Sequence, residues 1–435
     1  MNNTPISVFW FRRDLRIEDN AGLYHALKSG LPVLPLFIFD TEILDLLEDK
    51  ADKRVQFIYN EVSRLRDELK EHGSSIIIKI GKPATVWKEL MQEYDIKAVY
   101  TNHDYEPYGK ARDEQMGEML LSKGITFQTY KDCVIFEKDE VTKDDGLPYT
   151  VFTPYSRKWK AKLEKFYYKP YPTTKYAKHF AKSKPLHMPT LKEIGFEHSN
   201  FEYPARVVKN NIISNYDKTR DIPGIDGTSH LGLHLRFGTL SIRKLLAYAL
   251  ERNQTYVGEL IWRDFYHQIL WHFPHVTKGA FRKEYDAIQW RNNEKEFEQW
   301  CQGKTGIPIV DAGMRELNET GYMHNRVRMI TASFLTKHLL IDWRWGEAYF
   351  AEKLLDFDLS ANNGGWQWSA GCGTDAAPYF RIFNPLTQAD KFDKDRKYIN
   401  RWVPEVGTPS YPQPIVDLNE GRDRCLAAYK KALAK

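Results

Sequence analysis

The stretch DFDLSANNGGWQWSAGCGTDAAPYFRIFNP, residues 356–385, combines two acids, an Asn pair, a Gly pair and two tryptophans in its first half. Glycine in a helix interior costs roughly 1 kcal/mol against alanine, so this composition favours a loop over a plain helix. Polar Asp356 and Asn362 sit near bulky Trp366 and Trp368 with few lysines, which indicates burial. Buried polar groups need partners, and glycines allow close approach of the backbone to a ligand. Taken alone, the stretch favours a glycine-rich loop with two core tryptophans, and a loop that wraps a cofactor is the alternative that the rest of the chain has to support.

The composition is that of a globular protein. The chain has 435 residues, enough for two or three domains, with 42% hydrophobic and 28% charged residues. Its net charge of +5 is only mildly basic, so binding of nucleic acid would require a local basic patch. Aromatic residues make up 14% of the chain, and such rings fill cores or stacking surfaces.

The cysteine pattern and the N-terminus bear on location. Four cysteines are scattered without a CxxC or metal-ligand spacing, which favours a reducing compartment and predicts neither a disulfide framework nor a metal site. The first apolar run is too short for a signal peptide, and no run of about 18 apolar residues follows. We therefore expect a cytoplasmic protein that does not contact a membrane.

Apolar runs of strand character alternate with helical periodicity over residues 1–130. The run VLPLFIFD at 33–40 is nearly continuous, as in strands buried on both faces. The alternation predicts an α/β domain with an open, mostly parallel, doubly wound sheet. Neither GxGxxG nor GxxxxGK[ST] follows the first strand, although the carboxyl ends of such strands can still bind a ligand. Strands are predicted at 7–11, 33–40, 75–80, 97–101 and 125–130, and helices at 21–29, 52–71, from Pro83, and at 110–122.

The rest of the chain divides into a connector and a helical domain. Residues 131–205 are rich in Lys, Tyr and Pro, and predict a long surface connector with one short helix near 157–165. A basic, aromatic strip for nucleic acid is the alternative to a solvated linker. Strand signals vanish from about residue 210, so residues 206–435 are predicted to form an all-helical domain.

Small residues and hydroxyls precede a helical pattern near residue 230. Tyr216 and Arg220 come shortly before this run. Backbone N–H and hydroxyl groups ahead of a helix form a phosphate cradle, and an ordinary helix N-cap is the alternative. The candidate cradle residues are Thr228, Ser229, His230, Leu231 and Gly232.

The segment GELIWRDFYHQIL, residues 258–270, carries mixed chemistry on one helical face. Glu259, Trp262, Arg263 and Tyr266 fall at i, i+3, i+4 and i+7. A face with a carboxylate, an indole, a guanidinium and a phenol can stack on and hydrogen-bond a base. An amphipathic surface with an ion pair is the alternative.

The segment GYMHNRVRMITASFL, residues 321–335, carries two arginines that diverge on a helix. One of Arg326 and Arg328 can serve a phosphate outside while the other pairs with a buried acid such as Asp356. Asn325 and Met329 lie one turn apart. Two exposed arginines are the alternative.

Dispersed tryptophans form a further candidate set. Indole is easily oxidised, so Trp290, Trp343 and Trp366 can pass an electron between surface and interior, although scattered tryptophans are usually core residues. No HExxH, nucleophile elbow or Cys/His pair appears, and the histidines after residue 266 meet no metal-ligand spacing. The sequence thus points away from hydrolase and metal chemistry.

Taken in order, these segments resemble the DNA photolyase/cryptochrome flavoproteins, most closely the class I cyclobutane pyrimidine dimer photolyases. The resemblance covers nearly the whole chain and implies an α/β antenna domain joined to a helical domain that holds FAD. It also implies UV-damaged DNA as the partner of a monomeric protein. The segments that carry it are VFWFRRDLRIEDN (8–20), GTSHLGLHLRFG (227–238), GELIWRDFY (258–266), GKTGIPIVDAGMRELNETGYMHNRVRMITASFL (303–335) and residues 356–385.

The resemblance assigns a role to each candidate residue. For the phosphate and ribose part of FAD, it implies a lining of Tyr216, Thr228, Ser229, His230, Leu231 and Gly232. It implies that the flavin end is met by Asp356, Phe357 and Asp358, with Arg328 paired to Asp356. It also implies that Asn362 faces flavin N5. It implies an electron-transfer chain of Trp366, Trp343 and Trp290, from innermost to outermost. It implies a pocket for the flipped dimer from Glu259, Trp262, Asn325, Arg326, Met329 and Trp368, with Arg263 and Tyr266 on the same face and Arg220 and Gln388 near the DNA backbone.

The implied reaction is light-driven electron transfer from reduced FAD to a flipped-out dimer, ring splitting and return of the electron. Cryptochrome-type signalling and repair of (6-4) photoproducts are the alternatives, and Asn325 with Met329 favours cyclobutane dimers. Many relatives have Arg and Ser where this chain has His230 and Gly232, which weakens two phosphate contacts. Gly109 stands where folate-binding relatives carry Glu, so the antenna chromophore is a folate, a deazaflavin, another flavin or none.

Overall fold

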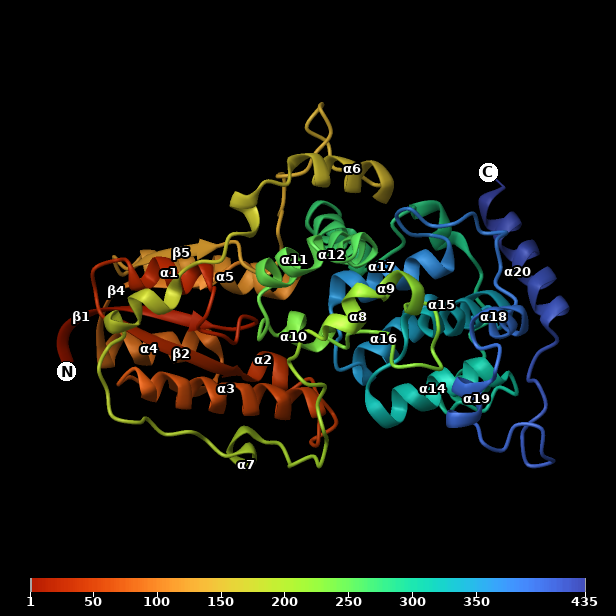
Figure 1. The fold of residues 1–435 in the computed structure, drawn as a ribbon, viewed down its shortest axis with the longest axis horizontal. Coiled ribbons are helices and arrows are strands. Elements are labelled where there is room, and N and C mark those ends of the chain that lie inside the picture. The colour runs from red at the N-terminus through yellow and green to blue at the C-terminus, as the bar shows by residue number, and fades with distance from the viewer. Residues whose placement is uncertain (1, 435) are drawn as a thin grey trace. The chain divides into compact units, whose positions relative to one another are not determined.

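The computed structural model describes residues 2–434, and the chain forms two compact units (Figure 1). The first unit comprises the residues through Ile135, together with Glu164–Val207 and Leu231–Tyr248. The second comprises Phe136–Leu163, Val208–His230 and the residues from Ala249 onward. Each unit is therefore discontinuous in sequence, and the segment 131–205 contributes to both.

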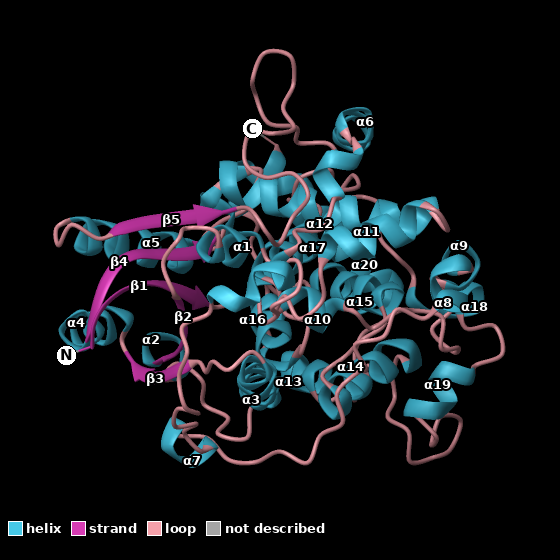
Figure 2. Ribbon diagram, turned by 60° about the vertical axis from the view of Figure 1, so that its left-hand side comes forward, coloured by secondary structure: helices cyan, strands magenta, loops and turns pink. Residues whose placement is uncertain are grey.

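The first unit is built on a parallel sheet of five strands in the order β3-β2-β1-β4-β5. Figure 2 shows these strands in magenta, side by side. Apolar runs explain the central strands, since every residue of the second strand is buried. The predicted open parallel α/β class is confirmed. The strands are β1 (Asn2–Phe11), β2 (Val33–Asp40), β3 (Ile77–Gly81), β4 (Tyr94–Asn102) and β5 (Thr126–Tyr130).

Helices cover both faces of the sheet. Val8 and Trp10 point to one face, where they share a core with Trp87 and Leu90 of α4 (Pro83–Glu93) and with α5 (Pro107–Leu121). Phe9 points to the other face and meets α1 (Ala21–Leu27), where a Cβ on Gly22 would lie 2.9 Å from the Phe9 ring. Alternation along β1 thus places its side chains in two separate cores.

The predicted helices of the first 130 residues are present within a few residues of the expected bounds. In the segment predicted as a connector, residues 131–205, the short helix expected near 157–165 corresponds to α6, which begins earlier, at Phe152. The remaining elements in chain order are α2 (Thr41–Leu44), α3 (Lys53–Glu71), α6 (Phe152–Lys162), η1 (Lys165–Tyr168), η2 (Thr173–His179), α7 (Leu191–Ile194), α8 (Asn210–Ser214), α9 (Tyr216–Thr219), α10 (Gly232–Arg236) and α11 (Ile242–Leu250).

The second unit is helical from Ala249 onward, whereas Leu231–Tyr248, inside the predicted helical domain 206–435, belongs to the first unit. The core of the second unit is rich in rings, with Trp300 and Tyr429 fully buried. Its elements are α12 (Gln254–His272), η3 (Pro274–Thr277), η4 (Lys283–Ala287), α13 (Glu294–Cys301), α14 (Pro308–Thr320), α15 (Asn325–Ser333), η5 (Phe334–His338), α16 (Trp343–Lys353), α17 (Leu359–Ala370), α18 (Pro385–Phe392), α19 (Lys397–Trp402) and α20 (Leu418–Leu433).

The sequence predicts a loop over the whole of residues 356–385, and this prediction is wrong for the first half of the stretch. Residues 359–370 form α17, whose N-terminus is capped by Asp358 accepting from the backbone of Ser360 and Ala361. Close helix packing explains the glycine, because a Cβ on Gly364 would lie 2.2 Å from the Tyr266 ring of α12. Tertiary contact therefore overrides the low helix propensity of glycine here.

Residues 2–434 offer neither a membrane-spanning helix nor a metal-ligand cluster. No helix there is both long enough and apolar enough to cross a bilayer. No three or more His, Cys, Asp or Glu side chains in that range gather as a metal site requires.

Candidate functional site

An ion pair joins α15 to the segment before α17. Arg328 Nη2 donates to both carboxylate oxygens of Asp356, at 3.1 and 2.9 Å, and Arg328 Nε donates to Met323 O at 2.7 Å. Burial alone would lower the pKa of Arg328, but Asp356 outweighs this and the pKa is raised. Both side chains are half-buried, at 24% and 18% exposure, and a single guanidinium nitrogen bonds both carboxylate oxygens. The pairing of Arg328 with Asp356 expected from the sequence is present.

Hydroxyl and imidazole groups gather next to this pair. Thr228 Oγ1 lies 3.0 Å from the hydroxyl of Tyr322, and the Tyr322 ring lies 4.2 Å from His230. Tyr322 also lies under the Arg328 guanidinium, at 5.5 Å. His230 has a left-handed backbone with φ of 52°, and burial lowers the pKa of its imidazole. A strained non-glycine residue amid polar groups is typical of a ligand-binding turn.

Two further tyrosines extend this cluster. Ser229 Oγ lies 3.0 Å from the hydroxyl of Tyr256, and the rings of Tyr216 and Tyr256 meet edge to face at 5.0 Å. Burial raises the pKa of Tyr256 to about 12, so its phenol stays protonated at neutral pH. The other two expected cradle residues belong to the first unit, where Leu231 is buried and Gly232 begins α10.

One face of α17 is open. Asn362, Gly365 and Trp368 are half-buried along it, and a Cβ on Gly365 would meet no atom of the described residues within 4 Å. Asn362 Nδ2 donates to Glu347 O at 3.1 Å, which fixes the side-chain amide. Trp366, one helical turn after Asn362, is buried at 2% exposure.

These residues fit FAD. Hydroxyls, an imidazole and a guanidinium supply donors for its diphosphate and ribose, and the open face of α17 beside Asn362 has room for a flat ring. Phe357 packs half-buried against the helical core. The carboxylate of Asp358 is already engaged, because it caps α17 and lies 3.7 Å from His267 Nε2. Of the two expected acids, Asp356 is therefore the better placed to orient a ligand.

A face of α12 presents the four residues expected to share it. Glu259, Trp262, Arg263 and Tyr266 are all half-buried, whereas the residues between them are buried. Arg220 Nη1 donates to Glu259 Oε1 at 2.5 Å. Burial raises the pKa of Glu259 despite this cation, so the carboxyl is poised to carry a proton more readily than an exposed one.

Sequence reasoning missed the partner of Trp262. The ring of Phe152, at the start of α6, stacks on Trp262 with centroids 3.7 Å apart and planes 4° from parallel. Such a stacked pair fixes the indole in one orientation. No sequence signal links the two residues, which are more than a hundred positions apart. Tyr322 and Tyr256 were also missed, although Tyr322 stands inside the quoted segment 321–335.

The start of α15 lies at the surface. Asn325 is exposed, and Arg326 Nη2 donates to Asp221 at 2.7 Å while its guanidinium covers the Phe392 ring at 4.2 Å. Met329 Sδ lies 3.8 Å from Arg326 Nη1. Arg326 is therefore already paired with a carboxylate that is 43% exposed. Gln388 lies half-buried on α18.

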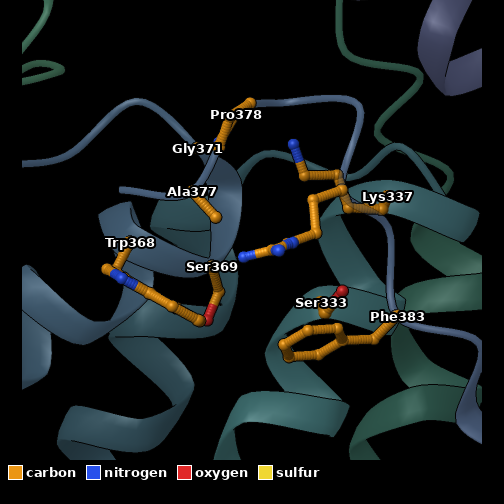
Figure 3. Close-up of a pocket in the computed structure, with 9 residues that line it drawn as sticks. Ser333, Lys337, Trp368, Ser369, Gly371, Ala377, Pro378 and Phe383 are labelled. Carbon is orange, nitrogen blue, oxygen red and sulfur yellow. The ribbon is translucent and has the colours of Figure 1, made fainter. Parts of the chain in front are cut away.

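Trp368 borders a small cavity beyond the open face. Figure 3 shows this cavity with Lys337 and Phe383 also in its lining. Its volume of about 10 Å³ holds one water at most. Lys337 is buried and donates to Ala370 O at 2.8 Å, and burial lowers the pKa of its amine to about 8. The cavity is too small for a ligand.

The three candidate redox tryptophans belong to one core. Trp343 and Trp366 are each 2% exposed, and half-buried Trp290 packs against the same cluster. Gly346 makes room for Trp366, since a Cβ there would lie 2.1 Å from the indole. The Arg344 guanidinium lies 4.7 Å above the Trp343 ring. Trp290 is thus the most exposed of the three, while Trp343 and Trp366 are equally buried, so the order of the chain stays a prediction.

The carboxyl end of the sheet in the first unit is filled by charged side chains. Arg12 pairs with Asp113, and Asn102 Nδ2 donates to Asp14 at 2.6 Å. The cavity among them is about 20 Å³, which suits one water. At Gly109 in α5, a Cβ would lie 2.3 Å from the Asp104 carboxyl carbon, so a glutamate cannot stand there without displacing Asp104.

Comparison with known proteins follows the same division. Residues 7–175 match the family model described as DNA photolyase, and residues 256–409 match the model described as the FAD binding domain of DNA photolyase. The deoxyribodipyrimidine photo-lyase of Synechococcus sp. is 37% identical over 98% of this chain and 97% of its own. That of Escherichia coli is 36% identical over 97% of this chain and 98% of its own.

Solved structures agree with the fold. A class III photolyase from Agrobacterium tumefaciens has a TM-score of 0.87 at 30% identity, covering 100% of this chain and 99% of its own. An archaeal photolyase from Sulfolobus tokodaii, solved with two FAD molecules, has a TM-score of 0.82 at 34% identity, covering 98% and 99%. With two family models and full-length relatives in agreement, the chain belongs to the DNA photolyase family.

Proposed function

We propose that this protein is a deoxyribodipyrimidine photo-lyase, which uses light and FAD to split cyclobutane pyrimidine dimers in DNA. The observation that carries the proposal is the presence of two sites in one helical unit. One site gathers hydrogen-bond donors suited to FAD at Arg328 and Thr228, and the other is the half-buried acidic and aromatic face at Glu259 and Trp262. Full-length relatives at 34–37% identity bear the name of this activity.

The residues that hold the cofactor come from separate segments of the second unit. Thr228, Ser229 and His230 would bind the diphosphate and ribose, and Arg328 held by Asp356 would bind near the flavin. Asn362, fixed by Glu347 O, would present its amide to the ring edge. When bound, FAD supplies the light-driven electron transfer, and the protein supplies position and electrostatics.

The residues that hold the lesion would act by stacking and hydrogen bonding. Trp262, backed by Phe152, offers a rigid apolar wall, and Trp368 offers a second one on α17. A dimer disturbs its own base pairing, so extruding it costs less than extruding a normal base. Glu259, with a raised pKa, would hydrogen-bond a thymine carbonyl, while Arg220, Arg263 and Arg326 would sit near phosphates.

The experiment is a repair assay with light as the switch. FAD-loaded, reduced protein is mixed with an oligonucleotide holding one cyclobutane dimer, and dimer content is followed under blue light and in the dark. We expect dimer loss only in the light. An oligonucleotide with a (6-4) photoproduct is the matched control, and its repair instead would point to the other photolyase activity. Binding of FAD without repair of either lesion would favour a signalling protein.

We propose a cytoplasmic monomer that binds UV-damaged DNA. A second chromophore, if bound, is a folate, a deazaflavin or a flavin, and the filled sheet end with its cavity of about 20 Å³ holds none of these without moving Arg12 or Asp104. An absorption spectrum of the chromophores released from purified protein distinguishes the types.

A further inference from the structure

One segment of the first unit is strongly basic. Residues 165–187 contain six lysines and neither Asp nor Glu, whereas the whole chain has a net charge of only +5. The remaining residues therefore carry slightly more acidic than basic side chains. All six lysines are exposed, and none of them forms an ion pair with a residue in the part of the chain that the structure describes. They are Lys165, Lys169, Lys175, Lys178, Lys182 and Lys184.

Backbone hydrogen bonds hold this segment on the first unit. Tyr171 N donates to Asp19 Oδ1 at 2.7 Å, and Ala181 N donates to Val33 O at 2.8 Å. Between these two points, η2 packs against α1. The lysines of this stretch are therefore presented from a backbone that is already ordered, so binding a ligand costs little conformational entropy.

Aromatic rings from three segments form a row beside these lysines. The Tyr176 ring centroid lies 5.5 Å from that of Tyr24, and the His25 ring lies 5.2 Å from Tyr24. His25 in turn stacks on Tyr130, with centroids 4.3 Å apart and planes 7° from parallel. Tyr171 joins the row at 5.3 Å from Tyr24. All five rings are half-buried, so part of each ring stays exposed to solvent.

Two more lysines lie over rings of this region. Lys28 Nζ lies 5.1 Å from the Tyr24 ring centroid and 5.8 Å from that of Tyr176. Lys131, the residue after β5, has its Nζ 5.8 Å from the ring of Tyr167 on η1, which extends the row to that element. An ammonium group over a ring places a cation for a phosphate next to a surface on which a base can stack.

Phe166 continues the row at the surface. Its ring is 79% exposed and meets the Tyr167 ring edge to face at 5.5 Å. Single exposed apolar side chains are common on proteins. Phe166, however, stands between Lys165 and Lys169 in the sequence, and its neighbour Tyr167 lies under Lys131. An exposed ring flanked by cations is suited to stacking on an unpaired base.

We propose that this row and its lysines bind single-stranded nucleic acid, as a second site in addition to the one proposed for the lesion. The bases stack on the rings, and the phosphates pair with the lysines. Net positive charge selects a polyanion, and only unpaired bases present their faces to rings. All the residues involved belong to the first unit, and none has a proposed role in binding FAD or the dimer. Binding at this site therefore needs neither light nor FAD.

The test measures binding in the dark. FAD-loaded protein is titrated into a fluorescent oligothymidylate of about 15 nucleotides, which is within the usual site size for single strands. An excess of unlabelled duplex carrying one dimer fills the lesion site. We expect the oligothymidylate to stay bound, and to bind more tightly than an undamaged duplex of the same length. Its displacement by the lesion duplex, or equal affinity for the undamaged duplex, overturns the proposal.

A ring variant tests stacking. Phe166→Ala removes an exposed ring that is not part of the core, and should weaken binding of the oligothymidylate by about 5- to 30-fold. Leu46→Ala is the matched control, because Leu46 is also 79% exposed in the first unit and lies outside the row. It should leave the dissociation constant unchanged. Equal effects of the two variants, or no effect of Phe166→Ala, overturn the proposal.

A charge variant tests the phosphate contacts. Lys169→Gln combined with Lys175→Gln should make the slope of log K against log salt less steep by about 1.4, since each phosphate neutralised on a single strand contributes about 0.7. Lys82→Gln combined with Lys88→Gln removes two exposed lysines at α4 and should leave the slope unchanged. An equal change in both double variants would show that only the overall charge matters, which overturns the site.

Further measurements identify the strand and separate this site from the repair function. Oligouridylate of the same length shows whether the site prefers RNA or DNA, and binding of either supports it. Binding to vesicles of phosphatidylglycerol without binding to either oligonucleotide points to a membrane surface instead and overturns the proposal. Loss of dimer repair with oligothymidylate binding intact refutes only the proposed function, whereas intact repair in Phe166→Ala with weakened oligothymidylate binding supports a separate site.

Discussion

Two ion-paired regions of the molecule differ in how deeply their charged side chains are buried. In the first unit, the side chains of Asp19 and Arg243 are 0% and 5% exposed and bind each other at 2.8 Å. In the second unit, Arg328 and Asp356 pair at 2.9 Å but are 24% and 18% exposed. Fully buried ions are tolerated only when completely paired, whereas half-exposed ones keep donors for a ligand. The difference separates a network that holds the fold from pairs that are available for binding.

The largest effect is expected on breaking the buried network. Arg243→Met leaves Asp19 and Asp132 short of a cation that bonds both, at 2.8 and 2.7 Å. We expect a loss of about 3–5 kcal/mol in the free energy of unfolding, because two buried carboxylates lose a partner. Urea unfolding measures it. Lys158→Met removes an exposed pair with Asp144 and should change stability by less than about 0.5 kcal/mol, and equal losses in both variants would contradict the comparison.

A smaller effect is expected from acid. Burial would raise the pKa of Asp132, but Arg16 and Arg243 outweigh it and lower the pKa to about 2. A carboxyl with a lowered pKa stabilises the fold above its unfolded pKa of about 3.9 and loses this contribution as the pH falls toward 2, by about 2–3 kcal/mol. Between pH 5 and pH 2, the free energy of unfolding should therefore decrease less in Asp132→Asn than in the unchanged protein. An identical slope in the variant would show that other carboxyls carry the acid sensitivity.

On the ligand side, Arg328→Met is expected to weaken FAD binding by about 10- to 100-fold, since it removes charge-assisted donors worth about 1.5–3 kcal/mol. Fluorescence titration of released FAD gives the dissociation constant. Arg326→Met is the matched control on the same helix, because Arg326 pairs with Asp221 and not with Asp356. If both variants lose FAD equally, the two pairs do not differ in role.

The smallest effect is expected at Glu259. Glu259→Gln keeps the shape and one acceptor but removes a charge and its pairing with Arg220, which should lower the quantum yield of repair by about 2- to 5-fold, or roughly 1 kcal/mol. Repair per absorbed photon measures it, with the binding ratio of damaged to undamaged DNA recorded in parallel. An unchanged yield would remove Glu259 from the lesion site.

Local patterns predicted the elements, and distant contacts explain what they missed. The run at 33–40 forms β2 over those same residues, because an apolar strand is a property of its own sequence. Gly364 misled the prediction, since the reason for a glycine inside α17 is the Tyr266 ring on another helix. The stack of Phe152 on Trp262 joins separate elements and leaves no periodic trace. Two divergent arginines on one helix predicted that one of them pairs with an acid such as Asp356, and the family resemblance selected Arg328.

The network around Arg243 has a consequence for biosynthesis. Arg243 follows Asp132 by 111 positions, yet its Nη2 bonds the Asp132 carboxylate at 2.7 Å. At about 5–20 residues per second, the ribosome delivers this arginine roughly 5–20 s after the last strand of the sheet. Until then the nascent sheet carries buried acids without their full set of cations. Folding of the first unit is therefore complete only after a late segment of the chain has been synthesised. Truncation before residue 243 should leave this unit incompletely folded.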